Sequence, residues 1–468
     1  MNPEVSVDVL VIGGGPGGTP AALALASAGQ RVLLAESGPG LGGTCLFEGC
    51  IPSKIFRETA ARRRDLACAR EFGLSLPDAA TAAVDWATVQ ARRHRILSAR
   101  AQAALAHART LSQLEVLFGR ARLTGPRTAL VELPEASQRV RFERAILSTG
   151  SVPNSLPIPG ADHPGVLDSA RLIGIGFVPD SLVLIGGGPI GIEMAQIFAM
   201  LGSQVTVLES ADRILKPVDS VLADRLQRRL TADGIAIEVG ARVLSIDGEA
   251  NRHRVAYATG AGQERDIEAG IVAIVAGRHP AVAGLGLETT AVQYDRHGVK
   301  VDATLQTGEE GIYATGDLIG HPMFAHWATS QALALAGHLL GESVTFPRPE
   351  FNSAVIFSSP ELGMAGLTEE AARAAGIDVG VVEYDYAGDA RAQIAGDADG
   401  LLRLIYRRED MGVVGVHALV AGASDLMGEA ALAIRAGVTL PDLAGAIHPH
   451  PTLTEAFGLA ARAVLGKR

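Results

Sequence analysis

The sequence lacks several features that mark common classes of protein. It has no uncharged apolar run long enough to span a bilayer, since even GPIGIEMAQIFAMLG contains Glu193. Positive charge is not in excess, and the net charge of -10 argues against a nucleic-acid or membrane-surface partner. The first residues lack the basic start and cleavage site of a signal peptide, which predicts a cytoplasmic location.

Cysteine is also scarce, and the chain contains only Cys45, Cys50 and Cys68. Structural disulfides are rare in the cytoplasm, so two cysteines five positions apart indicate redox chemistry or metal binding rather than a structural crosslink. A zinc site is disfavoured because no second Cys or His pair with ligand spacing lies nearby. A buried pair of free thiols stays open as an alternative, and Cys68, which has no partner, is interpreted as a structural thiol.

The spacing of the cysteine pair constrains the local backbone. On a regular helix, residues five positions apart have Cα atoms roughly 8 to 9 Å apart, too far for a disulfide. We therefore expect a distorted helix between Cys45 and Cys50, helped by Gly49 and Pro52. A strained disulfide is easier to reduce, which suits a catalytic bond.

With 468 residues the chain should form two to four domains, and one pattern occurs in it twice. An apolar strand runs into GxGxxG, a helix, a second strand and a glutamate, with the same spacing from first glycine to glutamate in both copies. One such glycine motif alone could be a simple turn. Two complete copies predict two dinucleotide sites, where glycines admit a pyrophosphate and the acid accepts ribose hydroxyls. The motif residues are Gly13, Gly15, Gly18 and Glu36, then Gly186, Gly188, Gly191 and Glu209.

The second copy should bind NAD rather than NADP. A ribose 2′-phosphate would be repelled by the carboxylate of Glu209. Arg213 follows closely and keeps NADP open as an alternative. Thr149-Gly150 and Thr315-Gly316-Asp317 indicate that the chain leaves the first nucleotide domain, builds the second and returns. From about Pro347 four alternating strands and an alanine-rich helix predict an α+β domain; the strand sequences are SAVIFSS, VGVVEYDY, LLRLIYRR and GVVGVHALV.

The order of these motifs carries a family resemblance over essentially the whole chain. The first fingerprint, GGTC(x)4CIPSK, the second fingerprint, AGRHP, YATGD and HPHPTLTEAF resemble the flavoprotein disulfide reductases, and among them the dihydrolipoamide dehydrogenases most. The resemblance implies an α/β fold with two Rossmann-like domains, for FAD and NAD, and a C-terminal α+β dimerisation domain. The implied domains are 1–150 (FAD), 151–277 (NAD), 278–347 (central segment completing the FAD domain) and 348–468 (interface).

The resemblance also implies a reaction: oxidation of protein-bound dihydrolipoyl groups to lipoyl, with reduction of NAD to NADH through FAD and a Cys45–Cys50 disulfide. Cys45 would exchange with substrate and Cys50 would face the flavin. Lys54, one of only four lysines, would pair with Glu193 beside the flavin. These roles are implied by the family pattern. From the residues alone, Lys54 could instead be an ordinary lysine on the surface.

A base is needed because the thiolate is the attacking species, and histidine is suited to this at neutral pH. His448 and His450 could otherwise be a His-x-His metal site or turn residues. By resemblance His450 is the base, Glu455 orients its ring, and it serves the cysteine pair of the other subunit of a homodimer. The cofactor residues implied are, for FAD, Gly13, Gly15, Gly18, Glu36, Thr44, Lys54, Ala121, Thr149, Gly150, Ser151, Asp317, Met323, Ala325 and His326, and, for NAD, Gly186, Gly188, Gly191, Glu193, Glu209, Val243, Gly277 and Arg278.

The redox motif departs from the family pattern at Phe47-Glu48, where Asn-Val is usual. A carboxylate beside the thiols should disfavour their ionisation unless it points to solvent. Glu48 is therefore expected to tune the thiol pKa or the choice of partner. The implied partner is a lipoyl-bearing protein: the lipoyl domain of a 2-oxoacid dehydrogenase complex, a glycine-cleavage H-type protein or a specialised lipoate-binding protein.

Three other functions compete with this interpretation. An NAD(P)H-dependent, glutathione-reductase-like enzyme for a small thiol commonly uses NADPH, which Glu209 opposes. Mercuric reductase needs a second cysteine pair near the C-terminus, and none follows Cys68. A flavin-binding structural or regulatory protein without the reaction would not be expected to keep both cysteines, Lys54 and His450 together.

Overall fold

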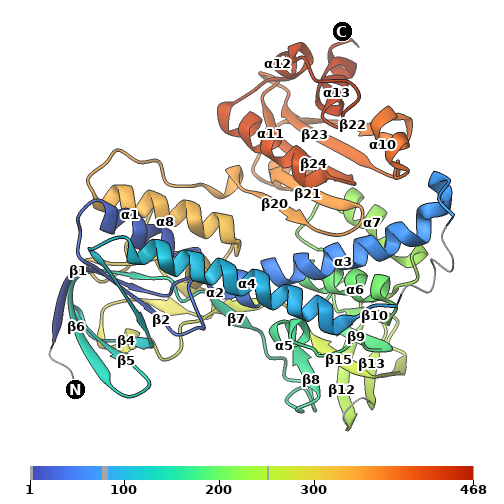
Figure 1. The fold of residues 1–468 in the computed structure, drawn as a ribbon. Coiled ribbons are helices and arrows are strands. Elements are labelled where there is room, and N and C mark those ends of the chain that lie inside the picture. The colour runs from blue at the N-terminus through green and yellow to red at the C-terminus, as the bar shows by residue number, and fades with distance from the viewer. Residues whose placement is uncertain (1–3, 76–82, 250–251, 467–468) are drawn as a thin grey trace.

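The computed structural model describes residues 4–75, 83–249 and 252–466, and a seven-stranded sheet contains the N-terminal strand (Figure 1). Its strand order is β3-β2-β1-β6-β5-β4, and β19, from much later in the chain, pairs with β6. The part around β1 is parallel, and β4 and β5 extend it in antiparallel fashion. The bounds are β1 Val5–Ile12, β2 Val32–Glu36, β3 Leu114–Phe118, β4 Arg120–Gly125, β5 Thr128–Glu132, β6 Ser137–Leu147 and β19 Ile312–Ala314.

A second sheet repeats the parallel design, in the order β11-β10-β9-β15-β8. Its central strands are continuous apolar runs, as expected where helices cover both faces of a parallel sheet. The chain reaches this sheet after leaving β6 and returns to the first sheet at β19. The bounds are β8 Val166–Asp168, β9 Ser181–Ile185, β10 Gln204–Glu209, β11 Ala236–Val239 and β15 Ile271–Ile274.

Smaller sheets flank these two. An antiparallel sheet of β12, β13 and β14 follows the second nucleotide motif, and two strand pairs, β7 with β16 and β17 with β18, lie outside the main sheets. The β7–β16 pair joins the segment after β6 to the segment after β15. The bounds are β7 Ser151–Pro153, β12 Arg242–Glu249, β13 Arg252–Ala258, β14 Glu264–Ala269, β16 Arg278–Pro280, β17 Tyr294–Asp295 and β18 Gly298–Val299.

The C-terminal part is an antiparallel five-stranded sheet, in the order β20-β21-β24-β23-β22, with α11 packed against it. The sequence pattern predicted four of these strands and missed β21, whose ELGMAG contains two glycines and no β-branched residue. β21 forms because both of its edges find partners, which a local pattern does not reveal. The bounds are β20 Ser353–Ile356, β21 Glu361–Gly366, β22 Val379–Asp385, β23 Leu401–Arg407 and β24 Val413–Val420.

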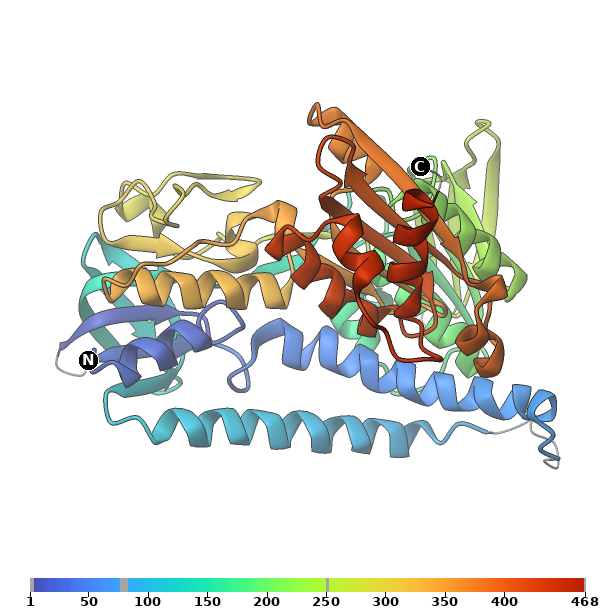
Figure 2. The same ribbon diagram turned by 90° about the horizontal axis from the view of Figure 1, so that it is seen from above.

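The longest helices, α3 and α4, lie side by side along one edge of the molecule (Figure 2). α1 and α6 follow the two glycine turns, and α13 closes the chain. No helix within the described ranges is long and apolar enough to cross a membrane. The bounds are α1 Thr19–Ser27, α2 Gly43–Phe47, α3 Cys50–Cys68, α4 Trp86–Arg109, α5 Ser169–Ile173, α6 Pro189–Leu201, α7 Ser220–Ala232, α8 Ala325–Leu339, α9 Glu369–Ala374, α10 Ala390–Ala395, α11 Ala423–Ala436, α12 Leu440–Gly445 and α13 Glu455–Leu465.

This architecture confirms the predicted fold class. Two helix-flanked parallel sheets of Rossmann type are followed by an α+β unit. In each parallel sheet a central strand, β1 or β9, leads directly into a glycine turn. Ligands of such sheets bind at the carboxyl ends of the strands, so the two turns mark the edges where nucleotides are expected.

Candidate active site

The cysteine pair lies where two helices meet. Cys45 belongs to α2, and Cys50 is the first residue of α3. Between them Gly49 has φ -141° and ψ -104°, far from helical values, so the helix is interrupted. This confirms the distortion expected from the cysteine spacing. Pro52 lies in the first turn of α3, where proline is tolerated.

The two thiols differ strongly in acidity. Both are free thiols in the structure, and Cys45 is less exposed than Cys50. Their hydrogen bond, together with burial, raises the pKa of Cys45. The same hydrogen bond, assisted by the ammonium of Lys54, lowers the pKa of Cys50 to about 7. The pair therefore keeps its proton on Cys45 and places the thiolate on Cys50.

Lys54 lies one turn further along α3 and forms an ion pair with Glu193 on α6, at 2.7 Å from Nζ to Oε2. The other carboxylate oxygen of Glu193 accepts a hydrogen bond of 3.0 Å from the backbone N–H of Phe357. The ring of Phe357 lies 4.4 Å from the Lys54 ammonium. Three distant parts of the chain thus meet beside the thiols, and the cation–π contact and ion pair fix the ammonium.

The position of Glu48 next to the cysteine pair suggested that its carboxylate acts on the pKa of the thiols. Glu48 is exposed, and the charged groups with the largest effects on the Cys50 pKa are Lys54 and Glu193. Burial lowers the pKa of Arg278, and the carboxylates of Asp317 and Glu48 oppose this effect. Glu48 therefore contributes to raising the pKa of Arg278, from a solvent-exposed position.

The histidine near the C-terminus forms the pair that the sequence suggested. His450 Nδ1 lies 3.1 Å from both oxygens of Glu455, the first residue of α13. The N–H of Thr452 donates to Glu455 at 3.0 Å, and this bond, with His450, lowers the pKa of the carboxylate. The His450 side chain is 72% exposed, so its outer edge can meet another molecule. No hydrogen bond within the described part of the chain joins it to Cys45 or Cys50.

His448 takes a separate partner. Its Nε2 lies 2.9 Å from Glu429 on α11, and its side chain is 9% exposed. Among the residues that the structure describes, the buried Nδ1 of His448 has no hydrogen-bond partner. Because His448 and His450 pair with different glutamates, the two side chains do not share one centre as a His-x-His ligand pair would.

The two glycine motifs hold their acidic residues in the same way. Glu36 accepts hydrogen bonds from the N–H groups of Gly14 at 2.6 Å and Gly38 at 2.5 Å. Glu209 accepts from those of Gly187 at 2.6 Å and Ala211 at 2.7 Å. Each carboxylate oxygen thus keeps acceptor capacity for a ribose hydroxyl, because a carboxylate has about four lone-pair sites.

The glycines show that both turns can admit a pyrophosphate. A Cβ on Gly18 would lie 1.9 Å from Gly13 O, and one on Gly191 would lie 2.0 Å from Gly186 O, so these glycines are required by internal packing. A Cβ on Gly188, in contrast, would meet no atom within 4 Å, and one on Gly15 would meet only Gly43, at 3.7 Å. The middle glycine of each motif therefore opens onto a space that a side chain would fill, which fits the diphosphate of a dinucleotide.

The side chain of Arg213 binds the backbone of its own loop. Its guanidinium donates to the backbone carbonyls of Leu215 at 3.2 Å, Lys216 at 2.7 Å and Val218 at 3.1 Å. These three bonds give the arginine a structural task in the loop after β10. It is not available as an independent cation for a ribose 2′-phosphate.

Several of the remaining residues predicted for FAD lie where the chain leaves and re-enters the first sheet. Ser151 Oγ donates to Asp317 at 2.6 Å, and Thr149 Oγ1 donates to the carbonyl of Ala281 at 3.1 Å. Ala121 is buried in the core of the first sheet, so only its backbone could reach a ligand. The other positions are Thr44 in α2, Gly150 before β7, Met323 before α8, and Ala325 and His326 in its first turn.

His326 and Arg278 bind protein groups. His326 Nε2 lies 2.6 Å from the carbonyl of Ser353, at the start of the C-terminal sheet. Arg278 donates from Nε to Ser151 Oγ at 2.8 Å and from a terminal nitrogen to Ser151 O at 2.6 Å. Gly277 precedes Arg278 with φ +86°, and Val243 lies in β12. Arg278, predicted for NAD, and Ser151 and Asp317, predicted for FAD, therefore form one connected group.

One residue of this region, Phe357, was missed by sequence reasoning, and the contact made by Thr315 of the TGD motif was not predicted. Phe357 supplies both a backbone donor and a ring to the Lys54–Glu193 pair, yet nothing in SAVIFSS distinguishes it from a strand residue. Thr315 Oγ1 donates to Gly17 O at 3.1 Å, across 298 positions of sequence. The TGD motif was the only sign of this second contact.

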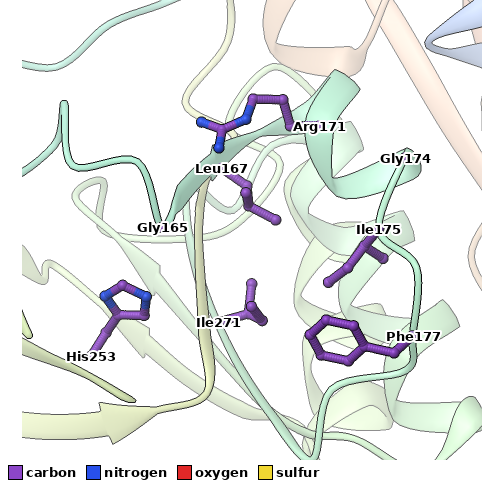
Figure 3. A pocket seen from close by; sticks show the side chains of 8 residues that line it. All are labelled: Gly165, Leu167, Arg171, Gly174, Ile175, Phe177, His253 and Ile271. Carbon is purple, nitrogen blue, oxygen red and sulfur yellow. The ribbon is translucent and has the colours of Figure 1, made fainter. Parts of the chain in front are cut away.

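Two pockets near the second sheet do not coincide with this site. One, of about 420 Å³, is lined by residues including Leu167, Phe177 and His253, with Ile271 at its floor (Figure 3). Ile271 begins β15, so the pocket lies at the amino ends of the second sheet, opposite the glycine turn after β9. None of the predicted site residues lines it.

Comparisons with known proteins cover nearly the whole chain. Residues 7–332 match the pyridine nucleotide-disulphide oxidoreductase model, and residues 352–461 match the dimerisation domain of the same family. The chain is 33% identical over 456 residues to a dihydrolipoyl dehydrogenase of Bacillus subtilis, covering 97% of this chain and 98% of the relative. It is 34% identical over 468 residues to a dihydrolipoyl dehydrogenase of Geobacillus stearothermophilus, covering 99% and 97%.

A solved structure is similar in the same way. It is a Cu(II) complex of RclA, an HOCl-induced flavoprotein disulfide reductase from Escherichia coli. The TM-score is 0.88 and the sequence identity 28%, with 99% of this chain and 100% of that chain covered.

Proposed function

Because this chain belongs to the pyridine nucleotide-disulphide oxidoreductase family, we propose that it is a dihydrolipoamide dehydrogenase, which oxidises protein-bound dihydrolipoyl groups and reduces NAD. As a family member it is a flavoprotein disulfide reductase with FAD and NAD(H) as cofactors. The observation that carries the finer proposal is the polarised thiol pair, with the proton on Cys45 and the thiolate on Cys50 beside the Lys54–Glu193 pair.

The proposal assigns the two glycine motifs to the two cofactors. Gly15 and Glu36 would hold FAD, and Gly188 and Glu209 would hold NAD. Support comes from the open space beside both middle glycines, and from Arg213 being bound to three carbonyls rather than free for a 2′-phosphate. When bound, the two cofactors supply onward transfer of an electron pair, which ends as a hydride on the nicotinamide.

The thiols of the chain carry out the exchange. A dihydrolipoyl thiolate attacks Sγ of Cys45 in a Cys45–Cys50 disulfide, which forms a bond to Cys45 and releases Cys50 as a thiolate. The second dihydrolipoyl thiol, once deprotonated, attacks the lipoyl sulfur of this mixed disulfide, closes the lipoyl ring and releases Cys45. The substrate loses two electrons and two protons. The cysteine pair gains both electrons and keeps one proton, on Cys45.

The other proton leaves through His450. Its Nδ1 is held by Glu455, so Nε2 is the nitrogen that accepts the proton of the dihydrolipoyl thiol. The carboxylate stabilises the imidazolium that results. The exposed position of this pair supports a role across a homodimer interface, in which His450 of one subunit serves the cysteines of the other.

The proposal includes a domain division and a partner. The domains would be 1–150 for FAD, 151–277 for NAD, 278–347 returning to the FAD domain, and 348–468 for the interface. The pairing of β19 with β6 supports the return. The partner would be a lipoyl domain of a 2-oxoacid dehydrogenase complex, a glycine-cleavage H-type protein or a specialised lipoate-binding protein.

The decisive experiment mixes the purified enzyme anaerobically with dihydrolipoamide and NAD, and separately with NADP, while the flavin and nicotinamide spectra are followed. We expect rapid NADH formation and little NADPH. Flavin that stays oxidised with dihydrolipoamide, yet is reduced by NADH or NADPH, would instead indicate a reductase for another disulfide. Phe47 and Glu48 would then be the first residues to change.

Replacing His450 with Gln tests the proton acceptor. We expect FAD to stay bound and the oxidation of dihydrolipoamide to fall by at least about 100-fold, as is typical for loss of a general base. A His448→Gln variant is the matched control, because His448 pairs with Glu429 and not with Glu455. Full activity in His450→Gln would remove the assignment.

A further inference from the structure

Helix α4 has an unusual charge for this molecule. It carries five arginines and two histidines, and its 24 residues include no Asp or Glu. The chain as a whole has a net charge of -10. Arg93 is partly buried and donates to the carbonyl of Ile173 at 2.6 Å. The other four arginines are exposed. Three of them, Arg92, Arg95 and Arg109, project from one side of the helix and are called here the α4 arginine face, whereas Arg100 projects about 80° around the helix from Arg92.

Within the described ranges, none of the four forms an ion pair, whereas arginines on three other helices do. In α3, Arg62 pairs with Glu58 at 2.6 Å, one turn away. Arg373 pairs with Glu369 at 2.9 Å on α9, and Arg229 pairs with Asp233 at 3.1 Å at the end of α7. Solvated helices are commonly stabilised by such pairs of opposite charge. The α4 arginine face has the charge without the partners.

The arrangement does not serve the stability of the helix itself. Arg92 and Arg95 lie three positions apart, where like charges repel. Neither lies in the last turn, where the helix dipole favours cations, and among the four only Arg109 is placed there. A feature that costs local stability without a gain elsewhere in the fold points to an external partner.

Helix α4, which carries the arginine face, also packs beside the redox site. α4 packs against α2 and α3, the two helices that carry the cysteines (Figure 2). A Cβ on Gly40 would lie 3.2 Å both from Ala101 of α4 and from the ring of Phe47, two residues after Cys45. Next to Ala101, Arg100 is close enough for its charge to favour ionisation of Cys45.

We propose that the α4 arginine face docks an acidic protein that carries the dihydrolipoyl arm, and guides that arm to Cys45. This inference rests on the proposed function, and it names the charge of the partner and the surface that receives it. From Arg92 to Arg109 the helix rises about 25 Å, and a helix with side chains is about 10 to 12 Å wide. Such a narrow surface suits a transient contact, in which charge complementarity raises the association rate more than the affinity.

The test compares a carrier with a small substrate. The carrier is a reduced lipoyl domain of net negative charge, and the small substrate is free dihydrolipoamide, which has no protein body to dock. In the double variant Arg92→Glu/Arg95→Glu we expect kcat/KM for the carrier to fall about tenfold at low salt, with no change for dihydrolipoamide. The loss should shrink toward nothing at about 1 M salt, where the screening length is about 3 Å.

Two controls separate docking from general effects. Arg139→Glu/Arg242→Glu makes the same charge change at exposed arginines of β6 and β12 that have no ion pair, and should leave kcat/KM for the carrier within about twofold. A lipoyl domain with its carboxylates near the lipoyl-lysine changed to amides should be insensitive to the α4 variant. Unchanged flavin absorbance confirms that each variant is folded.

The outcomes distinguish the inference from the function beneath it. If neither dihydrolipoamide nor the carrier is oxidised by the wild-type enzyme, the proposed function fails. If both are oxidised and the α4 variant handles the carrier normally at low salt, the docking inference alone is overturned. Equal losses of kcat/KM for the carrier and for dihydrolipoamide would also overturn it. Binding of duplex DNA to the wild-type enzyme in preference to the carrier would overturn it as well.

Discussion

The two nucleotide-binding motifs of this molecule share one backbone design but differ in what covers them. In both, the glutamate at the end of the second strand holds the turn through two N–H groups. In the first, Gly43 approaches the middle glycine closely, because a Cβ on Gly43 would lie 2.8 Å from Gly15 Cα. In the second, nothing lies within 4 Å of the Cβ position of Gly188.

The covering segment is the one that leads to the cysteines. Gly43 has φ +56°, which favours glycine, and it opens α2, where Cys45 lies. The first motif is also capped by Thr315, from the segment that returns to the first sheet. A covered site suits a cofactor that stays bound, and an open site suits one that exchanges in each turnover. The two turns thus share a local motif and differ in the segments packed on them.

The largest expected effect comes from placing a side chain in the space beside Gly15 and, in a separate variant, in the space beside Gly188. Gly15→Val should give protein without flavin absorbance and lower activity by at least about 100-fold, because its side chain would fill the space expected for the pyrophosphate. Gly188→Val should keep FAD and raise KM for NAD by about tenfold or more. Flavin content and NAD kinetics check both. If Gly188→Val loses FAD and Gly15→Val keeps it, the assignment of the two sites is reversed.

The two glutamates provide a smaller and sharper test. Glu209→Gln should lower kcat/KM for NAD about 10-fold, since hydrogen bonds to charged groups contribute about 1.5 to 3 kcal/mol, and should raise the use of NADP relative to NAD. The matched variant Glu36→Gln should weaken FAD binding without changing the preference between NAD and NADP. A preference that changes equally in both variants would contradict separate roles for the motifs.

The Lys54–Glu193 pair joins the two halves of the comparison, since Lys54 follows the first motif and Glu193 lies in the helix of the second. The pKa of Cys50 is about 7, so in the dithiol enzyme this sulfur should be a thiol below that pH and a thiolate above it. Lys54→Met removes a positive charge that favours the thiolate. The midpoint, followed by ultraviolet thiolate absorbance, should move up toward the ordinary value of 9.0.

Arg57→Met is the control for that titration. Arg57 also follows the first motif but pairs with Glu361, and it is not among the groups that shift Cys50. Its midpoint should stay near that of the wild-type enzyme. Midpoints that move together in Lys54→Met and Arg57→Met would show that the variants act through the fold instead of the charge.

The smallest effect is expected at Arg213. Because its guanidinium binds three backbone carbonyls, Arg213→Gln should lower the melting temperature by a few degrees at most, with a loss of about 1 kcal/mol. The preference for NAD over NADP should be unchanged. A clear fall in the residual use of NADP would show that this arginine reaches the nucleotide after all.

Much of the fold was readable from the sequence because its signals are local. The strand, glycine turn, helix and acid of each motif follow one another within a few dozen residues, and the structure confirms both Rossmann-type sheets. The broken helix at Gly49 followed from the cysteine spacing alone. β21 was missed because its weak strand sequence depends on two neighbouring strands for its conformation.

The sequence by itself determined the chemistry available: two sulfurs five positions apart, two glycine turns with their glutamates, and a histidine followed by Glu455. Only the tertiary structure decided how these groups are tuned. It brings Phe357 to Glu193, binds Arg213 to its own loop, and packs Gly43 against Gly15 while leaving the space beside Gly188 open. The physical reason is that hydrogen bonds, charges and steric contacts act through space, whereas sequence motifs report only neighbours along the chain.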